Sequence, residues 1–214
     1  MIVTLDGNKL DSSFRGHESL RSLIDQVRKD AASERLVVSV TVNGERFIEE
    51  GLDERLESPV GDDDQINLES YDRTELVADA LREMADKTGA AIATQTTLAE
   101  QLNKGDSASA LEGIGEFILL WQTCQKTIVQ SCDILRKNLT LNEYAGKTLA
   151  DHLSDLADKL REIRDAMQAS DFVLLADLLH YETPVLCETW QNVLNEMAAS
   201  LASTEQTARV TSGA

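Results

Sequence analysis

The chain has 214 residues, a formal net charge of −18, 42% hydrophobic residues and 27% charged residues. This hydrophobic content argues against a wholly disordered chain, and the lack of Lys and Arg clusters argues against a nucleic acid or an anionic membrane as the partner. Only nine side chains are aromatic, so the core must be built from Leu, Ile, Val and Ala, which favours helices over a β-sandwich.

Residues 1–72 have the apolar pattern and the turn residues of a small α+β domain. Asp6-Gly7-Asn8 predicts one hairpin turn, and Asn43-Gly44 is the strongest signal for a two-residue hairpin in the sequence. The predicted elements are, in chain order, a strand at residues 1–5, a strand at 9–15, a helix that begins after Ser19, strands at 36–42 and 46–49, a short segment at 52–56 and a last strand at 65–71.

This order of elements resembles the ubiquitin-like β-grasp arrangement. The resemblance covers only residues 1–72 and rests on the order and length of the elements, with no signature motif. Tyr71-Asp72 runs on into a predicted helix, so no free diglycine end exists, and the resemblance implies a recognition module and not a conjugated tag. A small α+β domain of another topology is the alternative.

From Asp72 onward the apolar residues recur every three or four positions, which predicts four long helices. One long pattern of this kind runs from Leu111 to Leu139 and is typical of a helix that packs along other helices at a shallow angle. Gly105 is predicted to end the first helix. The four helices are predicted to begin at Asp72, Asp106, Thr140 and Ser170.

Short connections between helices of similar length predict an antiparallel four-helix bundle at residues 73–203, with packing of the coiled-coil type. Pro184 lies inside the fourth helix and is predicted to kink it. This helix has more apolar side chains than one inner line needs, which favours a contact with the N-terminal domain or with a second subunit, as in a homodimer. The polar, aperiodic residues 204–214 are expected to be a disordered tail.

The three cysteines, Cys124, Cys132 and Cys187, include no CxxC pair, and we expect reduced thiols that behave as small hydrophobic groups. The first residues have neither a signal nor a transit pattern, and no apolar run approaches 18 residues. We therefore expect a cytoplasmic protein that does not insert into a membrane.

Catalytic motifs are missing from the sequence, so no catalytic residue and no cofactor is predicted. Gly113 and Gly115 lie inside the second predicted helix, where they are expected to permit close helix contact. The only metal-site hypothesis uses two acid–His pairs, because bundle metal sites place Glu-x-x-His on two helices. The candidate ligands are His152, Asp177, His180 and Glu182. Against this hypothesis, the pair His152 with Asp155 has the reverse order, and the first two helices have no carboxylate on their inner lines.

Four polar residues fall on the inner lines of the predicted helices. A buried polar layer of this kind fixes the register of the helices at some cost in stability, and a polar ligand cavity is the alternative. The layer is predicted to consist of Thr88, Gln95, Gln125 and Glu182. The segment 177–184 is predicted to be either a kinked helix packed on a neighbour or a docking epitope exposed at the kink.

The first functional hypothesis is a non-enzymatic interaction or adaptor protein that binds a protein partner or itself, with an export chaperone as one variant. The second is a metal-dependent bundle enzyme, and the third is a small-ligand sensor that uses the inner polar residues. The sequence names no partner, ligand or pathway.

Overall fold

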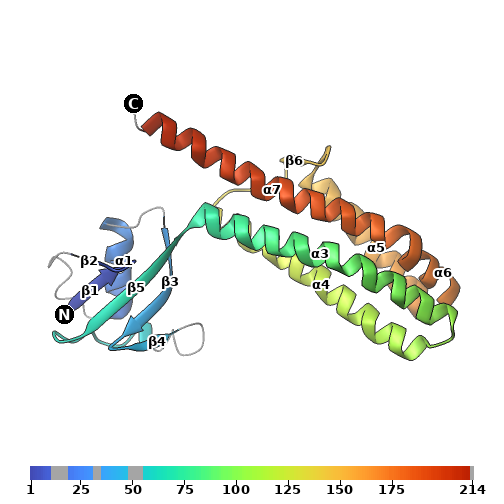
Figure 1. Cartoon of the computed structure of the whole chain (residues 1–214), viewed down its shortest axis with the longest axis horizontal. Coiled ribbons are helices and arrows are strands. Elements are labelled where there is room, and N and C mark those ends of the chain that lie inside the picture. Colours follow the sequence, from blue (N-terminus) through green and yellow to red (C-terminus); the bar gives the residue numbers. More distant parts are fainter. Residues whose placement is uncertain (11–18, 31–34, 48–54, 213–214) are drawn as a thin grey trace. The chain divides into compact units, whose positions relative to one another are not determined.

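A computed structural model of the chain describes residues 1–10, 19–30, 35–47 and 55–212, with side chains as far as Leu201 (Figure 1). The chain divides into two compact units, Met1–Leu76 (unit 1) and Val77–Ala214 (unit 2). The boundary predicted after residue 72 falls where strand β5 ends and helix α3 begins. The parts of the predicted segments at residues 11–15, 48–49 and 52–54 lie outside the described residues.

Unit 1 is an α+β unit with one five-stranded sheet in the order β2-β1-β5-β3-β4. Strand β1 pairs in parallel with β5, whereas the other pairs, β1–β2, β3–β5 and β3–β4, are antiparallel. The strands are β1 (Ile2–Leu5), β2 (Asn8–Lys9), β3 (Arg35–Val42), β4 (Glu45–Phe47) and β5 (Gln65–Asp72).

Helix α1 (Leu20–Asp30) buries one apolar stripe in the core of unit 1, because its apolar side chains recur at helical spacing. Both predicted hairpin turns form, with positive φ at Asp6 and Gly7 and again at Asn43 and Gly44. The buried core joins α1 to alternate residues of the three longer strands: Val3, Leu5, Leu20, Leu23, Ile24, Val27, Val40, Val42, Ile66 and Leu68.

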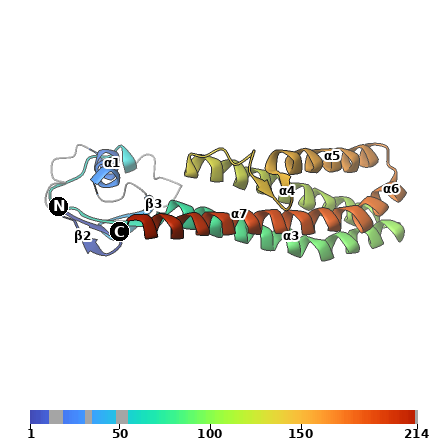
Figure 2. The same cartoon turned by 90° about the horizontal axis from the view of Figure 1, so that it is seen from above.

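Unit 2 is helical apart from one short hairpin, and its long helices run alongside one another (Figures 1 and 2). The Asp72 side chain accepts from the backbone N–H groups of Thr74 and Glu75, and so caps the start of the first helix. Gly105 follows the end of this helix with φ of +83°, as expected for a helix-terminating glycine. The helices are α3 (Arg73–Asn103), α4 (Ser107–Leu135), α5 (Leu149–Gln168), α6 (Phe172–Asp177) and α7 (Thr183–Ser212).

The helix predicted to begin at Thr140 begins later, at Leu149. Residues before it form a small hairpin of β6 (Glu143–Tyr144) and β7 (Lys147–Thr148), and Thr148 caps α5 by accepting from the Asp151 N–H. Ala145 and Gly146 both have positive φ, which is the geometry of a two-residue hairpin turn. The predicted helix start at Thr140 was therefore wrong, because the hairpin and its turn occupy residues that had been assigned to the helix.

The irregularity predicted at Pro184 takes the form of a π-helical segment, η2 (Leu178–Glu182), between α6 and α7. The Thr183 N–H bonds to the carbonyl of Leu178, five residues back. Proline has no N–H to give to the carbonyl four residues earlier, so the regular α-helical ladder cannot continue through this turn.

Helix α7 continues to Ser212, whereas the sequence predicts a disordered tail from residue 204. Once a helix is anchored, each added residue gains a backbone hydrogen bond without a new nucleation step, which accounts for the continued helical backbone.

The core of unit 2 is centred on two tryptophans. Trp121 of α4 and Trp190 of α7 are fully buried, with ring centroids 6.0 Å apart in an edge-to-face arrangement. Apolar side chains of α3, α5 and α6 pack in the same cluster. Among the described helices, none is both long and apolar enough to cross a membrane.

Candidate functional site

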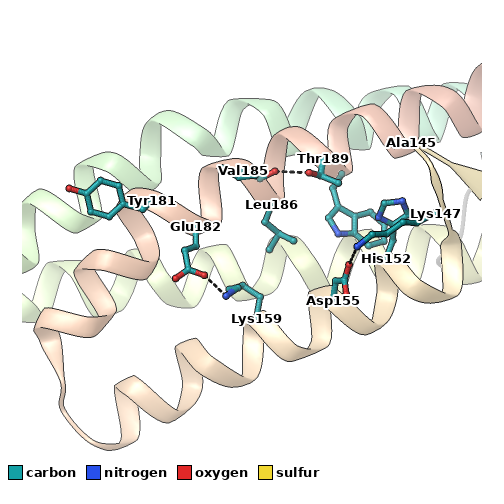
Figure 3. Close-up of a pocket in the computed structure, with 11 residues that line it drawn as sticks. Ala145, Lys147, His152, Asp155, Lys159, Tyr181, Glu182, Val185, Leu186 and Thr189 are labelled. Atoms are coloured by element: carbon teal, nitrogen blue, oxygen red, sulfur yellow. Dashed lines mark hydrogen bonds and ion pairs between the residues drawn. The ribbon is translucent and has the colours of Figure 1, made fainter.

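One hollow of unit 2 is a groove of about 490 Å³ (Figure 3). One wall is α5, the other wall is η2 with the first turns of α7, and the β6–β7 hairpin closes one end. The lining residues are Ala145, Lys147, His152, Asp155, Lys159, Tyr181, Glu182, Val185, Leu186, Thr189 and Trp190.

The α7 side of the groove has an apolar surface that is open to solvent. Trp190 is buried and Leu186 is partly buried, whereas Tyr181 and Val185 on the rim are 66% and 59% exposed. Large apolar side chains on a groove rim are characteristic of a surface that receives another molecule. A groove with an apolar wall and exposed apolar side chains at its edge is therefore available for binding.

Two lysines line the groove, Lys147 on β7 and Lys159 on α5, and both are engaged by carboxylates (Figure 3). Lys147 Nζ lies 2.7 Å from Asp155 Oδ2, and hydrogen bonding to this carboxylate raises the pKa of Lys147. Lys159 Nζ lies 2.6 Å from Glu162 Oε2 and also contacts Glu182 across the groove. The side chain of Lys159 is only 20% exposed.

Lys159 remains a cation in spite of its burial. Partial burial lowers its pKa, but hydrogen bonds with Glu162 and Glu182 outweigh that effect and raise the pKa above its ordinary value. One ammonium group thus faces two carboxylates, which leaves one negative charge without a neutralising partner in this trio.

His152 is placed for a structural role and does not face a set of ligands. It is 3% exposed, its Nε2 lies 2.8 Å from the carbonyl oxygen of Tyr144, and its ring packs 6.1 Å from that of Trp190. This contact ties the hairpin to α5.

The structure does not bring together the candidate ligands of the metal-site hypothesis. His152 is buried, whereas Asp177, His180 and Glu182 are exposed. Within the part of the chain that the structure describes, no group of three or more His, Cys, Asp or Glu side chains could hold a metal ion. The spacing of the acid–His pairs did not predict a metal site, because His152 is buried whereas His180 is exposed.

The predicted buried polar layer is present in part. Thr88 and Gln95 are fully buried, Gln125 is half-buried, and Glu182 is exposed, so the prediction for Glu182 is wrong. The inner line passes from Leu179 to Thr183 and Cys187 in steps of four residues, and Glu182 lies on the exposed side next to it. Thr183 is buried in place of Glu182.

The two buried polar side chains, Thr88 and Gln95, differ in whether all of their hydrogen-bonding groups have a partner. Thr88 Oγ1 donates to the carbonyl of Ala85 in its own helix, at 2.8 Å. Gln95 Nε2 donates to Cys187 Sγ at 3.0 Å, while Gln95 Oε1 has no hydrogen-bond partner among the described residues. The layer therefore links α3 to α7 through one weak hydrogen bond.

Sequence reasoning missed the groove itself, including Lys147, Lys159 and Val185. The one useful signal was the segment 177–184, for which an exposed epitope was one of two interpretations. Tyr181, Glu182 and Val185 from the region of this segment line the groove. The side chain of His180 is also exposed and packs edge-to-face with Tyr181, at 4.5 Å between ring centroids.

Comparison with known proteins adds relatives that are themselves uncharacterised. An uncharacterised protein of Treponema pallidum (strain Nichols) is 24% identical over 197 residues, which cover 91% of this chain and 97% of that protein. No solved structure matches the chain significantly. Residues 1–58 match a second family, described as Domain of unknown function (DUF8043). Residues 76–193, more than half of the chain, match the family described as Domain of unknown function (DUF8042), and the chain therefore belongs to that family.

Proposed function

We propose that the protein is a non-enzymatic interaction or adaptor protein that binds a segment of another protein in the groove between α5 and η2–α7. The observation that carries this proposal is the exposed pair Tyr181 and Val185 beside the apolar wall of the groove. Interface cores are richer in aromatic and apolar side chains than their rims, and the apolar wall of this groove with Tyr181 and Val185 beside it has the composition of such a core.

The state of the charged groups in the groove supports binding over catalysis. Lys147 and Lys159 are held by carboxylates, and His152 is held by a backbone carbonyl. A general acid or base needs a proton-transfer group free to reach a substrate, with a pKa near the working pH. Groups paired in this way instead form a fixed polar rim.

The architecture of the two units is consistent with an adaptor. We propose a β-grasp-like recognition module in unit 1, because its strand order places β1 and β5, the first and last strands, side by side in parallel at the centre of the sheet. We propose an antiparallel four-helix bundle in unit 2, formed by α3, α4, α5 and the continuous path of α6, η2 and α7, because these elements share one core. Each unit would then contribute its own binding surface.

Site-specific photocrosslinking in the native cells tests the adaptor function. A photoreactive phenylalanine analogue placed at Val185 should form a crosslink to a discrete protein. The same analogue at Val129 of α4 is the matched control, because this valine is 60% exposed, against 59% for Val185, and does not line the groove. Equal yields at the two positions, or no protein adduct at Val185, would contradict the proposed function.

A small-ligand sensor is a second candidate, supported by one observation. Gln95 lines a hollow of about 290 Å³ between α3 and α4, with Phe117 and Leu120, and Gln95 Oε1 lacks a partner among the described residues. Native mass spectrometry of the full chain tests this candidate. The mass should exceed that of the bare chain by one small molecule, and the excess should disappear when Ala91 at the hollow is replaced by Leu.

A further inference from the structure

We infer that the occupant of the groove is a basic amphipathic helix of a protein partner. This inference rests on the proposed function and names the chemistry of the partner. It combines three observations: the length of the groove, the apolar side chains along it, and the negative charge that surrounds it.

The groove is longer than the hollow described above. A second hollow of about 450 Å³ lies between α5 and α6 and is lined by Glu162, Ala166 and Ala169 on one side, with Leu174 and Leu178 on the other. On α5, the residues of the first hollow (152, 155 and 159) and those of the second (162, 166 and 169) follow one another at steps of three or four. They therefore lie on one face of one helix.

We take the two hollows, which lie along one side of α5, as the two parts of one channel. From residue 152 to residue 169 a helix rises by about 26 Å, at about 1.5 Å per residue. An α-helix of about 17 residues has the same length. The Lys159–Glu182 ion pair joins the two walls within the first hollow.

Apolar side chains follow one another along the opposite wall. Leu174, Tyr181 and Val185 are exposed, and Leu178 between them is buried in the wall. These side chains are spread along the wall, so they provide contacts for the apolar face of an amphipathic helix laid in the groove.

The charge around the channel selects a basic partner. The side chains that line the two hollows include two lysines, Lys147 and Lys159, and five carboxylates, a net charge of −3. The five carboxylates are Asp155, Glu162, Asp165, Asp171 and Glu182. The excess at the centre of the channel lies at Glu162 and Glu182, which share the single cation of Lys159.

A second copy of this chain fits the channel poorly. Two copies that meet through this face would bring two negative surfaces together, which is unfavourable at moderate ionic strength. A partner helix with Leu on one face and Lys or Arg on its flanks complements both the apolar wall and the charge.

The test uses the full chain and three fluorescent synthetic peptides of about 18 residues, each long enough to fill the channel. The first is a Leu–Lys peptide with leucines on one helical face, the second has the same composition in scrambled order, and the third has Glu in place of every Lys. Fluorescence anisotropy should show that the patterned basic peptide binds about tenfold or more tightly than the scrambled one, and the acidic peptide should not bind.

Two matched substitutions locate the binding. Val185→Lys should weaken the patterned basic peptide by about tenfold, because it removes an anchor and adds a like charge. Val129→Lys makes the same change at an equally exposed valine outside the channel and should leave the affinity unchanged. Equal binding of the patterned and scrambled peptides, or equal losses in the two variants, would overturn the inference.

Two further outcomes separate this inference from the proposed function. If light scattering shows a dimer that Val185→Lys dissociates, the occupant is a second copy and the basic-helix inference fails. If the Val185 crosslink reaches a partner segment of net negative charge, the adaptor function stands and the inference fails. A crosslink to a basic helical segment would support both.

Discussion

Two glycines two residues apart in α4 give a sharp test of how closely α3 and α4 pack. A Cβ atom added at Gly113 would lie 2.4 Å from Cδ2 of the buried Leu98 on α3. A Cβ atom added at Gly115 would meet no heavy atom of the described residues within 4 Å. The sequence predicts close helix contact at both positions, whereas the structure finds it at Gly113 alone.

The two alanine substitutions should therefore change stability in opposite directions. Gly115→Ala removes the conformational freedom of glycine in a helix interior and should stabilise unit 2 by about 0.5–1 kcal/mol. Gly113→Ala gains the same amount but forces Leu98 out of its place, and overpacking of this kind costs about 1–3 kcal/mol. We expect a net loss for Gly113→Ala and a difference of about 1–3 kcal/mol between the two variants.

Urea unfolding followed by tryptophan fluorescence measures this difference. Both tryptophans of the chain, Trp121 and Trp190, are buried in unit 2, so the signal reports the unfolding of that unit. If Gly113→Ala stabilises the protein as much as Gly115→Ala does, α3 and α4 do not approach each other closely at Leu98, and the packing argument is refuted.

The remaining predictions concern buried polar groups, thiols and a turn. Gln95→Met should raise the free energy of unfolding by about 1–2 kcal/mol in a urea titration, because it removes a buried acceptor that lacks a partner among the described residues. The control Gln122→Met, at an exposed position, should change the free energy of unfolding by less than about 0.5 kcal/mol. Burial raises the pKa of Cys124 to about 12 and that of Cys187 to about 11. Because the folded state favours the neutral thiols, their contribution to stability is complete below a pH of about 8.5, and it should be lost as the pH rises through the pKa values of the folded state. A variant with Ala at both positions should therefore lose less of its urea midpoint between neutral and alkaline pH. Ala145→Asn should raise the melting temperature, since Asn tolerates the φ of 47° at this turn better than Ala does, and a lower melting temperature would contradict the turn geometry.

Those parts of the fold that depend on local patterns were predicted from the sequence. The turns at Asp6-Gly7 and Asn43-Gly44 need residues that tolerate positive φ, and the helix stop at Gly105 has the same origin. The change from strands to helices at Asp72 follows from the change in apolar spacing. The two-strand hairpin before α5 was missed because Ala145-Gly146 is a weaker turn signal than Asn-Gly or Asp-Gly.

The candidate site could not be predicted because it depends on how two helices lie against each other. The contact of Lys159 with Glu182, for example, joins residues that are 23 positions apart in the sequence. A groove arises where the side chains of neighbouring helices leave space, and apolar spacing along one helix carries no information about that space. The net charge showed that the chain is acidic, but it did not show that acidic side chains are concentrated in residues 149–190.

The π-helical segment lies where the sequence analysis misplaced Glu182 and where the candidate site is formed. Glu182 was expected to be buried in a helix kinked at Pro184, whereas Thr183 is buried and Glu182 lies on the rim, where it contacts Lys159. The same turn lies between exposed Leu174 and exposed Val185, so it sets the relative direction of the two ends of the apolar wall. Single π-turns inside α-helices are frequent at functional sites, because each breaks the regular ladder and must be compensated by other contacts. The groove is formed at this departure from regular helix. For this reason we place the proposed binding surface on this turn and not on the regular faces of α3 and α4.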